Sequence, residues 1–119
     1  MKLKNLTIYD AKDAIMNLRE EKLPVKISVK VNKTLKSLIA QYNFIEERRI
    51  ELVKKYGTEK DGNIKVDPEN IPEFQREYAE LLSMEEEIEV RTISIDELPD
   101  SLEISSKDLE LLSFIFEDE

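Results

Sequence analysis

Residues 32–56 read NKTLKSLIAQYNFIEERRIELVKKY, and no other part of the chain is as long and as regularly patterned. Apolar residues recur along this stretch at alternating steps of four and three, at Val31, Leu35, Leu38, Tyr42, Ile45, Leu52 and Tyr56. Such spacing predicts an amphipathic helix with one buried face, interrupted at Arg49. At a rise of about 1.5 Å per residue the rod is roughly 37 Å long, so it needs a packing partner along its length.

A second long helix is predicted over residues 68–84. Asp67 and Pro68 form a typical helix start, an N-cap followed by a first-turn proline, and apolar residues then follow with helical spacing. The connection contains Asp61-Gly62, a tight-turn pair, and Gly57 fits the left-handed position after a helix end. The connection spans only residues 57–67, and a short connection favours an antiparallel pair of helices.

Residues 25–31 read VKISVKV and admit two interpretations. Strict alternation of β-branched and polar residues predicts a half-buried strand, which would leave Asn32 as the N-cap of the long helix. Alternatively, the long helix starts directly after Pro24, since proline is acceptable in a first turn. We favour the strand and pair it with a second predicted strand, IEVRTISI, at residues 88–95.

Shorter helices are predicted near both ends, over residues 8–20 and 106–116, the latter capped by Ser105. The fold class is therefore α+β and mainly helical, in a single domain over residues 1–119. It contains an antiparallel pair of long helices (about 32–56 and 68–84), a small sheet (25–31 and 88–95) and the shorter terminal helices.

Composition argues against most catalytic chemistry. The 119 residues include no Cys and no His, which removes disulfides, thiolate and imidazole metal ligands, the commonest general base and the thiol nucleophile. No glycine loop could cradle a phosphate. A calcium loop centred on Gly62 would place Gly57 and Pro68 at its two essential ends, where neither side chain can bind the ion. We expect no catalytic residue, no cofactor and no metal site, and hence a protein that is not an enzyme.

Charge is unevenly spread along the chain, whose net charge is −9. Residues 1–57 carry a net of +6, and residues 58–119 carry a net of −15. A folded chain can offset one half against the other, or the two halves can attract partners of opposite charge. The basic residues between Lys22 and Lys36 are all lysines, and this stretch contains no arginine and no aromatic residue that could stack on a base. Nucleic-acid binding is therefore not expected. Candidate anion-contacting residues are Lys26, Lys30, Lys33, Arg48 and Arg49.

The C-terminal stretch is apolar on more than one side. Its candidate interaction residues are Leu111, Phe114, Ile115 and Phe116. We predict that this segment pairs copies of the chain into a homo-oligomer or docks another protein, because a small domain rarely surrounds a terminal helix completely. The alternative is that the segment plugs the groove beside the long helices. Neither a membrane span nor a signal peptide is predicted, since no apolar run is long enough.

Several short segments of the chain are distinctive when taken together. They are Met1-Lys2-Leu3, Glu21 to Ser28 with the motif KLPVK at 22–26, Tyr56-Gly57, Asp61 to Ile64, Asp67-Pro68-Glu69, Leu81-Leu82 and Glu89-Val90. Together they resemble a family of small, uncharacterised proteins of tailed bacteriophages and prophages. The resemblance spans nearly the whole chain and implies a viral protein of the host cytoplasm or the virion, with no family active site to carry over. The favoured function is a non-enzymatic structural or assembly factor with a phage or host protein partner. The alternatives are an inhibitor of a host defence protein and a small-molecule sequestering protein.

Overall fold

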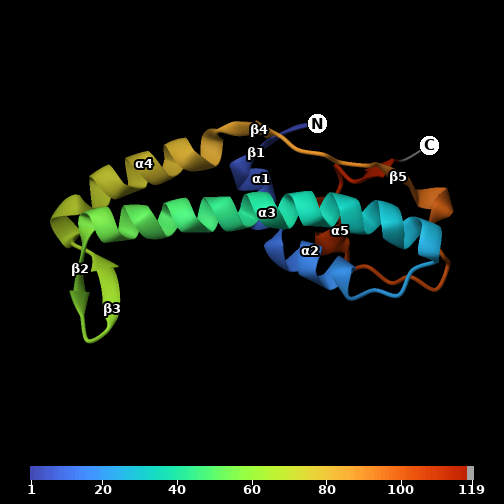
Figure 1. Ribbon diagram of the computed structural model, residues 1–119, viewed down its shortest axis with the longest axis horizontal. Coiled ribbons are helices and arrows are strands. Elements are labelled where there is room, and N and C mark those ends of the chain that lie inside the picture. Colours follow the sequence, from blue (N-terminus) through green and yellow to red (C-terminus); the bar gives the residue numbers. More distant parts are fainter. Residues whose placement is uncertain (118–119) are drawn as a thin grey trace.

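The computed structural model describes residues 1–117 of the chain. One helix, α3 (Val25–Tyr56), runs the length of the molecule, whose extents are 52 × 29 × 23 Å (Figure 1). Helix α4 (Ile71–Ser83) returns along its second half, while α1 (Asn5–Asp10) and α2 (Lys12–Arg19) pack against its first half and middle. The predicted α+β, mainly helical class is confirmed, with α3 packed against α4.

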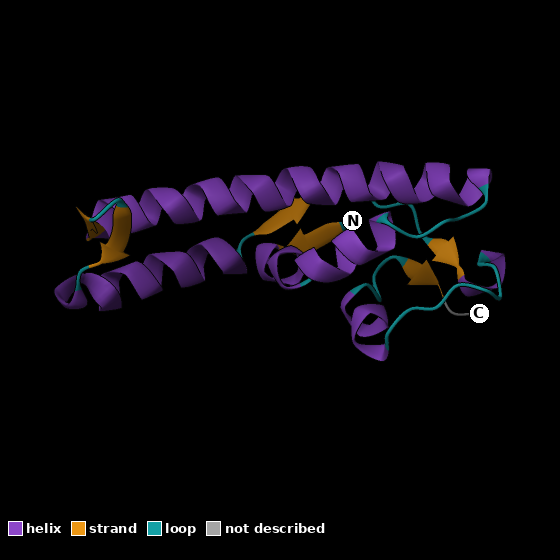
Figure 2. Ribbon diagram, turned by 90° about the horizontal axis from the view of Figure 1, so that it is seen from below, coloured by secondary structure: helices purple, strands orange, loops and turns teal. Residues whose placement is uncertain are grey.

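Three short sheets of two strands each complete the described chain, together with one further helix (Figure 2). The antiparallel pairs are β1 (Lys2–Lys4) with β4 (Glu85–Glu87), and β2 (Gly57–Lys60) with β3 (Asn63–Val66). The parallel pair is β5 (Ile93–Ser94) with β6 (Phe116–Glu117). Two single 3₁₀ turns, η1 (Pro68–Asn70) and η2 (Ile95–Glu97), and α5 (Ser106–Leu111) lie in the second half of the chain.

The predicted strand at residues 25–31 is wrong, and the alternative start of the helix after Pro24 is correct. Ser28 N donates to Pro24 O at 2.9 Å, which closes the first helical turn. Ile27 and Val31 are buried and continue the apolar face of the long helix backwards, whereas Val25 and Val29 are exposed. Asn32, the expected N-cap, therefore lies well inside α3. A strand would bury all four β-branched residues of this stretch, whereas the helix buries only Ile27 and Val31. The alternating pattern over seven residues is compatible with both.

The predicted strand at residues 88–95 is also largely wrong. Only Ile93–Ser94 at its end is a strand, and it pairs with the C-terminal segment rather than with residues 25–31. The acidic stretch just before it instead forms β4 and pairs with the N-terminus, in the register Lys2 with Glu87 and Lys4 with Glu85. Opposite charges thus face each other across this pair, an arrangement that favours cross-strand pairing.

The connection between the two long helices is a β-hairpin, and its two glycines are needed for different reasons. Asp61 (φ 52°) and Gly62 (φ 81°) both adopt positive φ, as the tight-turn pair predicted. Gly57 does not take the left-handed conformation expected of it, because its φ is −120° and its ψ is 172°. A Cβ at this position would lie 2.5 Å from Lys65 O and 2.6 Å from Val53 O, so close packing of backbone demands glycine here.

Both predicted terminal helices are shorter or less regular than expected. The stretch predicted as one helix over 8–20 is two helices that meet at Ala11, and the first of them begins at Asn5 rather than after Thr7. The predicted helix over 106–116 ends at Leu111, and the chain then turns into β6. Its predicted cap is confirmed, since Ser105 Oγ accepts from Asp108 N at 3.0 Å.

The hydrophobic core lies in one part of the molecule. It is formed where α1, α2, the first two-thirds of α3 and the C-terminal segment meet, with Leu35, Leu38, Ile45, Ile93 and Leu112 among its buried members. Asn5 is buried in the same region and joins three helices: its side-chain amide donates to Leu81 O at 2.9 Å and accepts from Gln41 at 3.0 Å. The part of α3 and α4 beyond this core projects as an arm.

Candidate interaction sites

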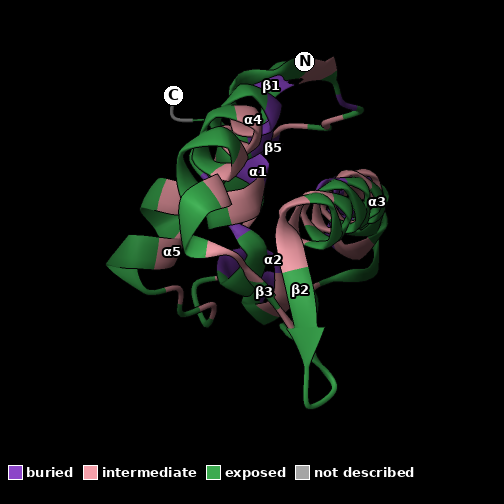
Figure 3. Cartoon of the chain, turned by 90° about the vertical axis from the view of Figure 1, so that its left-hand side faces the viewer, coloured by how far each residue is buried: buried purple, intermediate pink, exposed green. Residues whose placement is uncertain are grey.

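The arm comprises residues 46–80, and none of these residues, all of which the structure describes, is fully buried. Figure 3 looks at the molecule from the arm end and shows exposed and half-buried residues on β2 and β3. Most of its apolar side chains are half-buried between the elements, at Leu52, Val53, Tyr56, Ile64, Val66, Phe74 and Tyr78, and Ile50 and Ile71 are exposed. An arm of this kind offers a large surface and contributes little core of its own.

A groove between α3 and α4 lies near the base of the arm. Its apolar lining is Leu52, Leu81 and Met84, and its volume is about 330 Å³. Met84 is 51% exposed and is the most exposed apolar side chain in this groove. Charged side chains flank it, and Lys55 Nζ bridges the two helices by contacting Glu77 at 3.1 Å. The groove is thus an apolar floor with a mixed-charge rim, which is a typical composition for a protein-docking surface.

The arm is anchored to the core by a half-buried cluster around Glu46. Tyr9 from α1 and Tyr42 from α3 each donate a hydroxyl hydrogen bond to Glu46 Oε2 at 3.2 Å, and Arg49 pairs with Oε1 of the same carboxylate. Tyr78 from α4 packs edge-on against Tyr9, with ring centroids 6.3 Å apart. One carboxylate therefore connects the N-terminal helix to the long helix at the point where the arm leaves the core.

This cluster shifts the pKa of Glu46, Tyr42 and Tyr78. Burial alone would raise the pKa of Glu46, but the hydrogen bonds from Arg49, Tyr42 and Tyr9 outweigh it, so the pKa of this carboxyl is lowered. Burial, followed by the hydrogen bond to Glu46, raises the pKa of Tyr42, and burial raises that of Tyr78. The sequence held one indication of this cluster, namely that the apolar periodicity of the long helix breaks at Arg49. The tyrosines that surround Glu46 could not be found by spacing alone.

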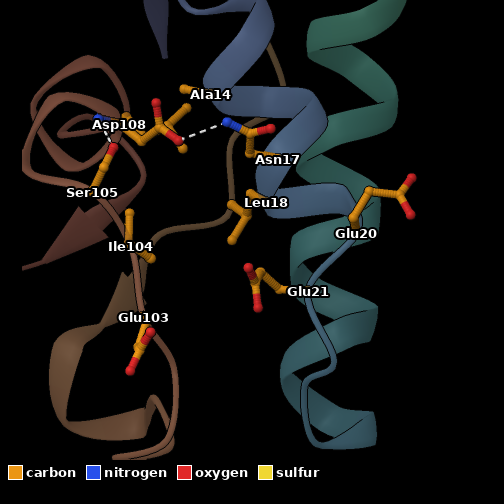
Figure 4. A pocket seen from close by; sticks show the side chains of 10 residues that line it. Ala14, Asn17, Leu18, Glu20, Glu21, Glu103, Ile104, Ser105 and Asp108 are labelled. Atoms are coloured by element: carbon orange, nitrogen blue, oxygen red, sulfur yellow. Dashed lines mark hydrogen bonds between the residues drawn. The ribbon is translucent and has the colours of Figure 1, made fainter.

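An acidic pocket lies on the other side of the core, between α2 and α5 (Figure 4). Its floor is apolar, from Ala14, Leu18, Ile104 and Leu112, and its volume is about 330 Å³. Four acidic residues line it, Glu20, Glu21, Glu103 and Asp108, although the Glu20 side chain points away from the floor (Figure 4). Asp108 accepts a hydrogen bond from Asn17 at 2.9 Å, which ties α5 to α2 across the pocket.

The candidate anion-contacting residues do not form one site. Lys26 and Lys30 lie near the start of α3, about twenty residues and hence roughly 30 Å from Arg48 and Arg49 along the same helix. Lys30 pairs with Glu97 at 3.3 Å, Arg48 with Glu51 at 2.8 Å, and Arg49 with Glu46. The structure thus brings together no basic pocket from these residues, and it leaves Lys26 and Lys33 on an exposed face of α3.

The candidate C-terminal interaction residues divide between core and surface. Ile115 is fully buried, as is its neighbour Leu112, so this part of the segment fills the core as the plug alternative described. Leu111, Phe114 and Phe116 are half-buried and pack against the core cluster. The largest exposed apolar side chain of α5 is Leu109, at 41%. A continuous apolar face therefore does not remain on the surface of this segment.

Among residues 1–117, no three carboxylates converge in a way that could hold a metal ion. In the same part of the chain, no helix is both long enough and apolar enough to cross a membrane.

Comparisons with known proteins add no family assignment. The chain matches no family model, no curated protein and no solved structure.

Proposed function

We propose that this chain is a non-enzymatic interaction protein of a tailed bacteriophage or prophage, and that it acts as a structural or assembly factor. The observation that carries the proposal is the coreless arm, residues 46–80, which projects from a well-packed body. Proteins bury apolar surface when they can, so an arm whose apolar side chains are half-buried or exposed gains stability when a partner covers them.

The arm groove is the partner's docking surface in this proposal. Its apolar floor of Leu52, Leu81 and Met84 supplies contact area, and the charged rim supplies specificity. An elongated molecule with a groove near the base of an arm suits the joining of larger components. The geometry does not favour a small-molecule sequestering protein, because its candidate cations lie in two separate places and most are already paired.

The test is whether the chain joins phage particles through this groove. Mature and precursor particles would be purified from a phage that encodes the chain, and its copy number would be measured by mass spectrometry. We expect a fixed copy number for the wild type, a loss with Met84→Glu, and no loss with Gln75→Glu. Both side chains are exposed, so both variants add a charge without disturbing the core.

Two results would contradict the proposal. Absence of the wild-type chain from every particle form would remove the assembly role, and its recovery on one host defence protein would instead favour the inhibitor. Equal loss of the Met84→Glu and Gln75→Glu variants would show that the groove has no special part in binding.

A further inference from the structure

The start of α3 exposes an apolar pair that nothing in the described chain covers. Val25 is 79% exposed, the highest value among the large apolar residues, and Val29 one turn later is 48% exposed. Lys26 and Lys33 lie beside this face of α3, Lys22 lies in the loop just before it, and none of the three forms an ion pair within residues 1–117. We call these five residues the basic knob. The two valines form a small apolar patch that is free to contact another surface.

The acidic pocket between α2 and α5 has the opposite charge and a matching apolar floor. Ala14, Leu18 and Leu112 are buried below it, and Glu21, Glu103 and Asp108 line it, whereas the Glu20 side chain points away (Figure 4). An apolar pair flanked by lysines and an apolar floor flanked by carboxylates are complementary in both respects. The same chain carries both surfaces, so a second copy supplies the fitting partner without any other protein.

We propose that the basic knob of one copy docks into the acidic pocket of a second copy. The valines would contact the apolar floor, while Lys22 and Lys26 would pair with carboxylates such as Glu21 and Glu103. Each copy offers one knob and one pocket, and Glu21 of the pocket directly precedes Lys22 of the knob. Two copies can therefore exchange knobs in a two-fold dimer, and a head-to-tail contact would instead build a ring or a chain of subunits. The inference rests on the proposed assembly role for its purpose, but it uses surfaces outside the arm.

The same charges allow a test by exchange. The knob variant is Lys22→Glu with Lys26→Glu, and the pocket variant is Glu21→Lys with Glu103→Lys; all four side chains are exposed, so the fold should survive. Each variant alone has like charges on its knob and its pocket. In an equimolar mixture, however, the acidic knob of one variant meets the basic pocket of the other, and the unaltered knob meets the unaltered pocket.

Light scattering on the purified proteins measures their molecular mass in solution. At tens to hundreds of micromolar, we expect the wild type to exceed its monomer mass of 14.0 kDa, each variant alone to be monomeric, and the mixture to recover the larger mass. The control Lys60→Glu with Lys65→Glu, on the exposed β2–β3 hairpin, should associate like the wild type. Val25→Ser with Val29→Ser keeps the charges and should weaken association at least about tenfold. Circular dichroism confirms that each variant is folded.

Three outcomes would overturn this contact. They are a monomeric wild type throughout this concentration range, variants that associate as well as the wild type, and a mixture that stays monomeric although both variants are folded. None of them affects the arm groove, since Met84 and the particle measurement are independent of knob and pocket. Conversely, a chain that associates as expected but is absent from phage particles would support the contact between knob and pocket and contradict the assembly role.

Discussion

Glu46 is the residue on which three side chains from two helices converge. Its carboxylate accepts hydrogen bonds from Tyr9, Tyr42 and Arg49, and it lies where the arm leaves the core. Because the pKa of Glu46 is lowered in the folded chain, the charged form stabilises the fold. This stabilisation is fully present above pH 4.5, the ordinary pKa of the carboxyl. It is lost as the pH falls from there through the lower pKa of the folded chain.

The first prediction follows from this sign. Glu46→Gln should lower the melting temperature at neutral pH, and its melting temperature should then fall less than that of the wild type on acidification to about pH 3. Thermal melts across this range measure both effects. Glu47→Gln is the matched control, because Glu47 is exposed and forms no ion pair within the described residues, and it should follow the wild type. Parallel curves for all three proteins would contradict the role of Glu46.

The second prediction concerns the apolar face of α3. Leu38 is fully buried and Lys36, two positions earlier, is exposed. Leu38→Ala should lower the free energy of unfolding by about 2–5 kcal/mol, because it removes buried methyl groups and leaves a cavity. Lys36→Ala should change it by less than about 0.5 kcal/mol. Urea denaturation measures both values, and equal effects would mean that this face is not core.

At the scale of elements, the start of α3 decides how the N-terminal half packs. In a strand, residues 25, 27, 29 and 31 would share one face, but in the helix Ile27 and Val31 turn inward while Val25 and Val29 turn outward. Extension of the helix back to Val25 removes the predicted sheet and exposes the two valines of the basic knob. A single difference in backbone conformation therefore creates a candidate interaction surface.

The third prediction separates the two conformations. Ile27→Ala should lower the free energy of unfolding by about 2 kcal/mol or more, whereas Val29→Ala should change it by less than about 0.5 kcal/mol. Denaturant titration of the two variants gives the comparison. Similar, large losses for both would indicate the strand, in which the two side chains lie on the same buried face.

At the scale of the whole molecule, the chain is much longer than a compact domain. Its radius of gyration is 17.3 Å, whereas a compact chain of 119 residues would have about 13.5 Å. The arm accounts for this difference, because it extends beyond the core without a core of its own (Figure 1). Elements with few buried contacts open locally at low free energy.

The fourth prediction is therefore a gradient of protection along α3. Backbone amides of residues 50–56 should exchange with deuterium faster than those of residues 34–45, although both stretches belong to one continuous helix. Hydrogen exchange followed by mass spectrometry resolves the two. Uniform protection along α3 in the monomer would show that the arm is as well packed as the body. Added protection confined to the arm in the presence of a phage component would support docking there.

The sequence alone determined those features that depend on local chemistry. Helical spacing identified the long helix from Asn32 onward and its partner α4, the Asp61-Gly62 pair identified the turn between them, and Ser105 was correctly assigned as a cap. Each of these depends on contacts within a few residues, or on a periodicity long enough to exclude the alternative. Charge asymmetry was likewise evident from the sequence, but the surfaces that it forms were not.

Tertiary structure decided where local patterns were compatible with more than one fold. The local sequence of residues 25–31 slightly favoured a strand over a helix, but packing of Ile27 and Val31 into the core selects the helix. Pairing of residues 85–87 with the N-terminus, and of residues 93–94 with the C-terminal segment, joins parts of the chain that are far apart in sequence. The Glu46 cluster and the acidic pocket have the same origin. Contacts between distant segments leave no periodic pattern in either partner, and the free energy that selects them arises only when the whole core assembles.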